Sequence, residues 1–244
     1  MFSNVSIKAN LAKDHHNFYQ NILGMTLTDQ GWGFENQGAR LSFTHIPEPY
    51  QTQSDDLFWK IGITVVNLDL ACQWLRKQGF FVTEPRQFRD IGYLAHLSDP
   101  SGMTIELLQT TFSNSSPSTT LSHPISSGAT VAHISMRCHD RQKMMSWCQQ
   151  QGMVLKSIQP ALDFGFTLYF FSWVDEKLPE PELTSVANRE WLWQRPYTLL
   201  EFQLIDNAPP FLAPKEDKSG LFEIATESGV IINGRSLIEA GLAR

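Results

Sequence analysis

The stretch DPSGMTIELLQ, from Asp99 to Gln109, is the most informative part of the sequence. It begins with two turn dipeptides and continues as an apolar run rich in strand-forming residues. A single acid, Glu106, lies inside this run. A carboxylate within an apolar strand is costly unless a metal ion, a cation or hydrogen-bond donors compensate its charge. What surrounds Glu106 therefore decides whether this strand carries a functional site.

The strand that contains Glu106 ends a pattern that recurs along the chain. A strand, a helix and three further strands are expected over residues 57–110, and the same order is found over 1–45 and 130–205. Typical signals bound the expected helices, such as Asp140 before the third helix and Gly152 after it. A fourth, truncated copy covers 219–244. Such repeated βαβββ units predict an α+β fold, with curved mixed sheets around a cleft.

A stretch rich in Ser, Thr and Pro near the middle of the chain predicts a domain boundary. We expect a first domain over 1–112, a linker over 113–129 and a second domain over 130–244. The first domain would hold two complete units, and the second would hold one complete unit and the truncated one. The incomplete unit leaves a sheet edge short of partners, which favours a homodimer.

Composition excludes several classes of protein. The chain has a formal net charge of -6 and no basic run, which argues against binding to nucleic acid. No apolar run approaches the length of a membrane span, and no signal peptide is seen at the start of the sequence. The three cysteines form no CxxC pair, which suits a reducing compartment. We therefore expect a cytoplasmic protein whose partner is a small molecule, with no nucleic acid and no membrane.

The repeat, with the motifs FYQNILGM (18–25) and DPSGMTIELLQ, resembles the vicinal oxygen chelate superfamily. That superfamily includes glyoxalase I, the extradiol dioxygenases and the bleomycin resistance proteins. The resemblance covers almost the whole chain, is closest to glyoxalase I and implies two glyoxalase-like domains. Residues 57–110 look like the second unit of glyoxalase I, and 130–205 look like its first unit. This reversed order favours a cleft in which the second and third units face each other.

The resemblance also implies a set of site residues. In the family, each unit contributes one metal ligand from its first strand and one from its last strand. At the matching positions of this sequence, the third unit has His133 and Glu201, and the second unit has Lys60 and Glu106. The remaining positions are Asn4, Ser42 and Glu223, a poor set of metal ligands that we expect to be inert.

Two hypotheses follow from these four positions. His133, Glu201 and Glu106 suit a divalent zinc, nickel, iron or manganese ion, which would make the protein a lyase or isomerase that acts on a small oxygenated substrate. Glu106 would then abstract a proton, with Glu201 as a second catalytic carboxylate. Lys60, however, stands where the family usually has histidine, and a protonated lysine has no lone pair for a metal.

The alternative is therefore a metal-free protein that binds or sequesters a small molecule, with the charge of Lys60 replacing that of the metal. Whether the protein is an enzyme stays open at this point. A ring-cleaving dioxygenase is less favoured, because only one histidine occupies a matching position.

Substrate-binding residues are also implied by the resemblance. Arg137 matches an arginine that holds a glutathione carboxylate in glyoxalase I, and Arg89 matches a basic residue of a mobile loop. The sequence EFQLID after Glu201 lacks the asparagine expected there, which argues against glutathione. Strand alternation directs half of the aromatic residues toward a cleft, and we include Trp59 and Tyr169 among its candidates. For His96, cleft-lining and structural roles remain equally open.

Overall fold

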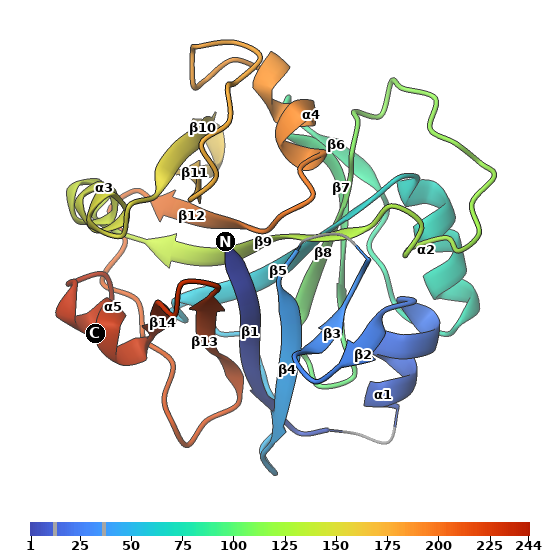
Figure 1. Cartoon of the computed structure of the whole chain (residues 1–244), viewed down its shortest axis with the longest axis horizontal. Helices are drawn as coiled ribbons and strands as arrows, with labels where there is room; N and C mark the ends of the chain where they lie inside the picture. Colours follow the sequence, from blue (N-terminus) through green and yellow to red (C-terminus); the bar gives the residue numbers. More distant parts are fainter. Residues whose placement is uncertain (12–13, 36–37) are drawn as a thin grey trace.

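The computed structural model describes residues 1–11, 14–35 and 38–244, which form two curved sheets with helices around them (Figure 1). The larger sheet has eight strands in the order β10-β11-β12-β9-β5-β8-β7-β6. Its strands are β5 (Phe58–Val65), β6 (Arg86–Phe88), β7 (Gly92–Ser98), β8 (Thr104–Gln109), β9 (Thr130–Cys138), β10 (Val154–Ala161), β11 (Phe166–Ser172) and β12 (Leu199–Ile205).

This sheet joins the second and third units through their first strands, because β5 runs antiparallel to β9. Within each unit the first strand lies parallel to the last, β5 to β8 and β9 to β12. The same strand order in both halves confirms the repeat. It also places the second unit against the third, as the reversed order of the units suggested.

The smaller sheet has six strands in the order β14-β13-β1-β4-β3-β2. It combines the first unit with the start of the fourth, since β1 is parallel to β4 and antiparallel to β13. The α+β class with curved mixed sheets is thus confirmed. Its strands are β1 (Phe2–Ala9), β2 (Thr26–Thr28), β3 (Gly31–Gly33), β4 (Arg40–His45), β13 (Gly220–Thr226) and β14 (Ile231–Asn233).

The expected linker does not separate the two sheets. Each sheet takes strands from both sides of residues 113–129, because the second unit pairs with the third and the first with the fourth. The division into domains at 1–112 and 130–244 stays a prediction.

Helices lie at the periphery of the molecule in Figure 1. The Asp140 side chain caps the third-unit helix by accepting a hydrogen bond from Lys143 N, and Asn67 caps the second-unit helix in the same way. One helix, over 187–193, was not expected from the sequence. The helices are α1 (His15–Asn17), which continues into the π-helical turn η1 (Phe18–Ile22), α2 (Leu68–Lys77), α3 (Arg141–Gln150), the 3-10 turn η2 (Leu162–Phe164), α4 (Ala187–Trp193) and α5 (Gly234–Glu239).

The turn at the start of DPSGMTIELLQ is built around Asp99. Its Oδ1 accepts hydrogen bonds from the backbone N–H groups of Ser101 and Met103, at 2.9 and 2.8 Å. Its Oδ2 accepts from the Tyr19 hydroxyl at 2.7 Å. Burial, together with the charge of Asp99, raises the pKa of Tyr19 well above its usual value. The turn thus closes the β7–β8 hairpin and ties the first unit to the second.

Among the residues that the structure describes, no helix is long and apolar enough to span a membrane.

Candidate functional site

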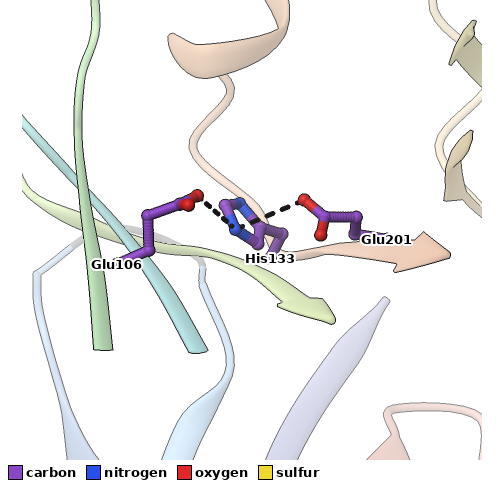
Figure 2. A group of neighbouring side chains, drawn as sticks. All are labelled: Glu106, His133 and Glu201. Atoms are coloured by element: carbon purple, nitrogen blue, oxygen red, sulfur yellow. Dashed lines mark ion pairs between the residues drawn. The ribbon is translucent and has the colours of Figure 1, made fainter. Parts of the chain in front are cut away.

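Four side chains meet where the second and third units join. Lys60 comes from β5, Glu106 from β8, His133 from β9 and Glu201 from β12, which are the first and last strands of the two units. All four are buried, with 4% or less of each residue exposed. Figure 2 shows the two carboxylates on either side of the His133 ring. The structure therefore brings together the four positions implied by the resemblance.

Lys60 is the counter-ion of Glu106. Its Nζ donates a hydrogen bond to Glu106 Oε2 at 2.6 Å and lies 3.7 Å from Glu201 Oε1. Burial alone would lower the pKa of Lys60, but the charges of Glu106 and Glu201 raise it above its usual value. Lys60 is therefore an ammonium, and the acid inside the apolar strand is neutralised by an amine of its own unit.

The pKa of Glu106 moves in the opposite sense. Burial alone would raise it, but the Lys60 ammonium and the nearby imidazoles of His133 and His96 hold it well below its usual range. A carboxylate with such a low pKa is a weak proton acceptor. This disfavours Glu106 as a base for as long as Lys60 stays in contact with it.

His133 occupies a space that only glycine leaves open. A Cβ added at Gly62, its partner on β5, would overlap the imidazole ring. His133 Nε2 lies 3.2 Å from Glu106 Oε1 and 3.6 Å from Glu201 Oε2. Neither ring nitrogen has a hydrogen-bond partner among the described residues. The ring is thus packed between two carboxylates, with Nε2 close to both.

Glu201 is oriented from its own unit. Its Oε1 accepts a hydrogen bond from the Ser135 hydroxyl at 2.8 Å, and Ser135 is fully buried beside it on β9. Ser135 is two residues from His133 on β9, so the two side chains share one face of the strand.

His96 belongs to the same cluster. It pairs with Glu106 across β7 and β8, and its Nε2 lies 3.0 Å from Glu106 Oε2. Its side chain is 30% exposed and lines a cavity beside the cluster. Of the two roles considered for His96, cleft-lining and structural, its position fits the cleft-lining role.

A metal ion is implied by the fold family, and the residues fit it only in part. Glu106, His133 and Glu201 form a buried group whose ligand atoms all lie within 4.8 Å of one another. Such oxygen and imidazole ligands suit a divalent ion, and His133 Nε2 faces both carboxylates. Lys60 does not fit. Its ammonium has no lone pair and contacts both carboxylates that would hold the ion.

A cavity of about 240 Å³ opens beside the cluster. Its wall is apolar and largely aromatic, and includes Trp59, Phe88, Phe166, Leu168, Phe170 and Trp193. Polar and charged side chains also line it, namely Lys60, Arg86, His96, Glu106, Glu201 and Gln203. A cavity of this kind, with an apolar wall and a few polar groups, is typical of a small-molecule site.

Three residues expected at the substrate do not line this cavity. Arg137 donates hydrogen bonds to the backbone oxygens of Gln53 and Asp56, at 2.8 and 2.9 Å. Arg89 forms an ion pair with Asp163 at 2.9 Å, and Tyr169 is buried in the core. None of the three is among the residues that line the cavity, whereas Trp59 and Lys60 are. Substrate contacts of Arg137, Arg89 and Tyr169 stay predictions.

Residues of the cavity that the sequence analysis missed include Arg86, Phe88 and Gln203. Gln203 shares a strand face with Glu201, and this alternation could have indicated it. Arg86 and Phe88 lie on the short edge strand β6, for which the sequence carries no comparable signal.

Within residues 1–11, 14–35 and 38–244, the smaller sheet has no comparable group of His, Cys, Asp and Glu side chains at its matching positions. The Asn4 side-chain oxygen accepts hydrogen bonds from the hydroxyls of Ser42 and Ser6, at 2.8 and 3.1 Å. Asn4, Ser42 and Ser6 thus hydrogen-bond one another and carry no charge, and the one acid among the matching positions is Glu223. The expected inertness of this position stays a prediction.

Comparison with known proteins finds a family that part of the chain resembles. Residues 12–107 match the model of the Glyoxalase/Bleomycin resistance protein/Dioxygenase superfamily. Over this stretch, which is less than half of the chain, the sequence is similar to that superfamily. No curated protein matches the sequence.

Solved structures of glyoxalase I from Zea mays share the fold. A glutamate-to-glutamine mutant of that protein matches with a TM-score of 0.65 and 14% identity, covering 92% of this chain and 74% of the maize chain. A second structure of maize glyoxalase I gives a TM-score of 0.63 and 15% identity, covering 92% and 73%. At these identities the likeness establishes the fold alone.

Proposed function

We propose that the protein is a metal-independent small-molecule binding protein in which Lys60 replaces the charge of a metal ion. The observation that carries the proposal is the 2.6 Å contact between Lys60 Nζ and Glu106 Oε2. An ammonium at this place gives the two carboxylates the positive charge that a ligated ion would supply. The adjoining apolar cavity supports binding of a small molecule as the activity.

Metal analysis tests the proposal directly. The protein is to be expressed with zinc, nickel, iron and manganese in the medium and purified without a chelator. We expect well under one ion per chain, since Lys60 competes for both carboxylates. A stoichiometric ion in the wild-type protein would overturn the proposal.

A substitution at the same position provides the positive control. Lys60→His replaces the ammonium by an imidazole and completes a set of two histidines and two glutamates, which suits a divalent ion. We expect this variant to gain stoichiometric metal. Lys143→His, on the exposed face of α3, is the matched control and should gain none.

A second candidate is the metal-dependent lyase or isomerase that acts on a small oxygenated substrate. The buried group of Glu106, His133 and Glu201 favours it. This candidate requires Lys60 to leave the carboxylates or lose its proton, and it requires His133 as a ligand. Metal binding by the wild-type protein that is lost in His133→Ala would support it against the first proposal.

We also propose that the protein is cytoplasmic and forms a homodimer. Buried, unpaired cysteines suit a reducing compartment, and the short terminal strand β14 leaves an edge of the smaller sheet available for pairing. Light scattering of the purified protein tests the dimer, and a monomer at all concentrations would refute it.

A further inference from the structure

Arg86 is a cation of the cavity lining whose charge no acid of the described chain neutralises. It lines the cavity, and its guanidinium forms no ion pair with any acid within residues 1–11, 14–35 and 38–244. The acids that lie close to it in the sequence have other partners, since Glu84 pairs with Arg76 and Asp90 pairs with Arg189. A free guanidinium presents a planar fork of N–H donors that matches the two oxygens of a carboxylate.

Arg86 lies at the opening of the cavity rather than in its depth. It is on β6, the edge strand of the larger sheet, and its side chain is exposed although it lines the cavity. Its guanidinium lies 5.9 Å from the centre of the Phe88 ring, which is also part of the cavity wall. A ligand carboxylate can therefore meet Arg86 while it stays partly hydrated, and it avoids the full cost of burying a charge.

An apolar row separates Arg86 from the charged cluster. Arg86 pairs with Leu94, Leu94 pairs with Leu108, and both leucines line the cavity. Glu106 is two residues before Leu108 on β8 and lies on the same face. With strands about 4.8 Å apart and about 6.7 Å for two residues along a strand, the backbones of Arg86 and Glu106 are roughly 12 Å apart. A ligand that reaches from Arg86 toward the cluster therefore needs an apolar body.

The cluster at the other end has no positive charge to spare. Glu106 and Glu201 share the ammonium of Lys60, which contacts both carboxylates. Two carboxylates against one ammonium leave this end negative when the imidazoles are counted as neutral. A ligand carboxylate is repelled from the cluster and attracted to Arg86, so charge sets the orientation of the ligand in the cavity.

Size and wall chemistry limit the apolar body. A cavity of roughly 150 Å³ is large enough for benzene, and this one holds about 240 Å³. Aromatic side chains such as Phe166, Phe170 and Trp193 form much of its wall. The space suits one ring on a short chain and does not suit a peptide or a nucleotide.

From these observations we propose that the cavity binds single-ring monocarboxylates, with the ring against the aromatic wall and the carboxylate on Arg86 at the opening. Arg86 is then the residue that determines specificity for an acid. The inference rests on the proposed binding function and adds its ligand class.

The test titrates three probes of one shape into the full chain by calorimetry at neutral pH: 3-phenylpropanoate, 3-phenylpropanamide and 3-phenylpropylamine. The carboxylate should bind about tenfold more tightly than the amide, because a charged hydrogen-bonded pair is stronger than a neutral one. The amine should be weaker than the carboxylate by at least about tenfold, since Arg86 repels it. Raising the salt concentration about tenfold should weaken the carboxylate severalfold and leave the amide unchanged, because charges at an exposed opening are screened.

Variants at one position connect this order to Arg86. Arg86→Met should weaken the carboxylate about tenfold and leave the amide within about twofold of the wild type, which also shows that the variant is folded. Arg86→Lys keeps the charge and loses the planar fork, so it should weaken the carboxylate only about threefold. Arg235→Met on α5, an exposed position that does not line the cavity, should change neither affinity.

Each outcome decides a specific point. Equal affinity of the wild type for carboxylate and amide, tighter binding of the amine, or a carboxylate preference that survives in Arg86→Met would overturn the inference but leave the binding function standing. Binding of none of the three probes would also overturn the inference. Stoichiometric metal, measured separately, would overturn only the metal-independent function.

Discussion

Lys60→Met is the substitution that tests the site most sharply. It keeps most of the length of the side chain and removes the ammonium that contacts Glu106 at 2.6 Å and Glu201 at 3.7 Å. Both carboxylates stay buried, with 4% and 1% exposed. The variant therefore leaves two acids without their counter-ion rather than removing a surface charge.

The expected cost follows from this burial. Removing one partner of a buried ion pair typically costs about 3–5 kcal/mol, because the remaining charge is left uncompensated. Total stabilities of single domains are about 5–15 kcal/mol, so the loss is a large fraction of the total. We expect Lys60→Met to fold but to unfold at a much lower urea concentration.

Urea unfolding followed by circular dichroism measures the free energy of unfolding. Glu106→Gln and the double variant Lys60→Met/Glu106→Gln complete a double-mutant cycle, and the coupling energy should be about 1–3 kcal/mol. Lys218→Met is the matched control, because Lys218 also pairs with a glutamate, Glu48, at 3.0 Å but on the surface. We expect the control to remain close to the wild type.

The lowered pKa of Glu106 also predicts that the free energy of unfolding depends on pH. The folded-state pKa of Glu106 lies well below its usual value, so this carboxylate stabilises the fold above the unfolded-state pKa. That contribution is lost as the pH falls through the folded-state pKa, so stability should fall in acid, below about pH 5. In Lys60→Met the folded-state pKa of Glu106 rises, and the acid-dependent loss attributable to Glu106 should shrink or reverse.

One result would refute this reasoning. If Lys60→Met costs less than about 1 kcal/mol, which is the size typical of exposed pairs, then Lys60 does not neutralise the cluster. Its contact with Glu106 would then contribute little, and the case for Lys60 as the replacement of a metal would fail.

Three further substitutions test neighbouring parts of the structure by the same unfolding measurement. Gly62→Ala places a Cβ against the His133 ring and should destabilise the protein by about 1–3 kcal/mol, and an unchanged midpoint would contradict the placement of that ring. Tyr19→Phe removes the hydrogen bond to Asp99 and should cost about 1.5–3 kcal/mol, because its acceptor is a buried carboxylate; a neutral effect would deny the link between the first and second units. Asp140→Ala removes the cap of α3 and should cost about 1 kcal/mol, whereas Asp163→Ala, on an exposed ion pair, should cost less.

Local patterns were enough to predict the repeat and the strands that carry the site. Turn dipeptides, capping residues such as Asp140 and the two-residue alternation of strands act over a few residues, so they can be recognised without the tertiary structure. The family resemblance then named Lys60, Glu106, His133 and Glu201, which the structure brings together. The helix over 187–193 was missed, because it lies in an irregular connection with no clear repeat signal.

The alternation of side chains along a strand predicted that half of the aromatic residues face the cleft. It did not predict which residues belong to that half. On β11, Phe166, Leu168 and Phe170 line the cavity, whereas Tyr169 and Phe171 are in the core. A period of two shows which side chains share a face. Only packing against the rest of the fold decides which face is turned inward.

The repeated unit, and the glutamates, histidine and lysine at its first and last strands, can be recognised from the residues alone. The tertiary structure decided how they meet, because the antiparallel pairing of β5 with β9 brings the two units into one sheet. That pairing sets the distance from Lys60 to Glu201 and seats His133 over Gly62. Gln203 lines the cavity beside this junction. Distances between units depend on register and sheet curvature, which no local sequence pattern encodes.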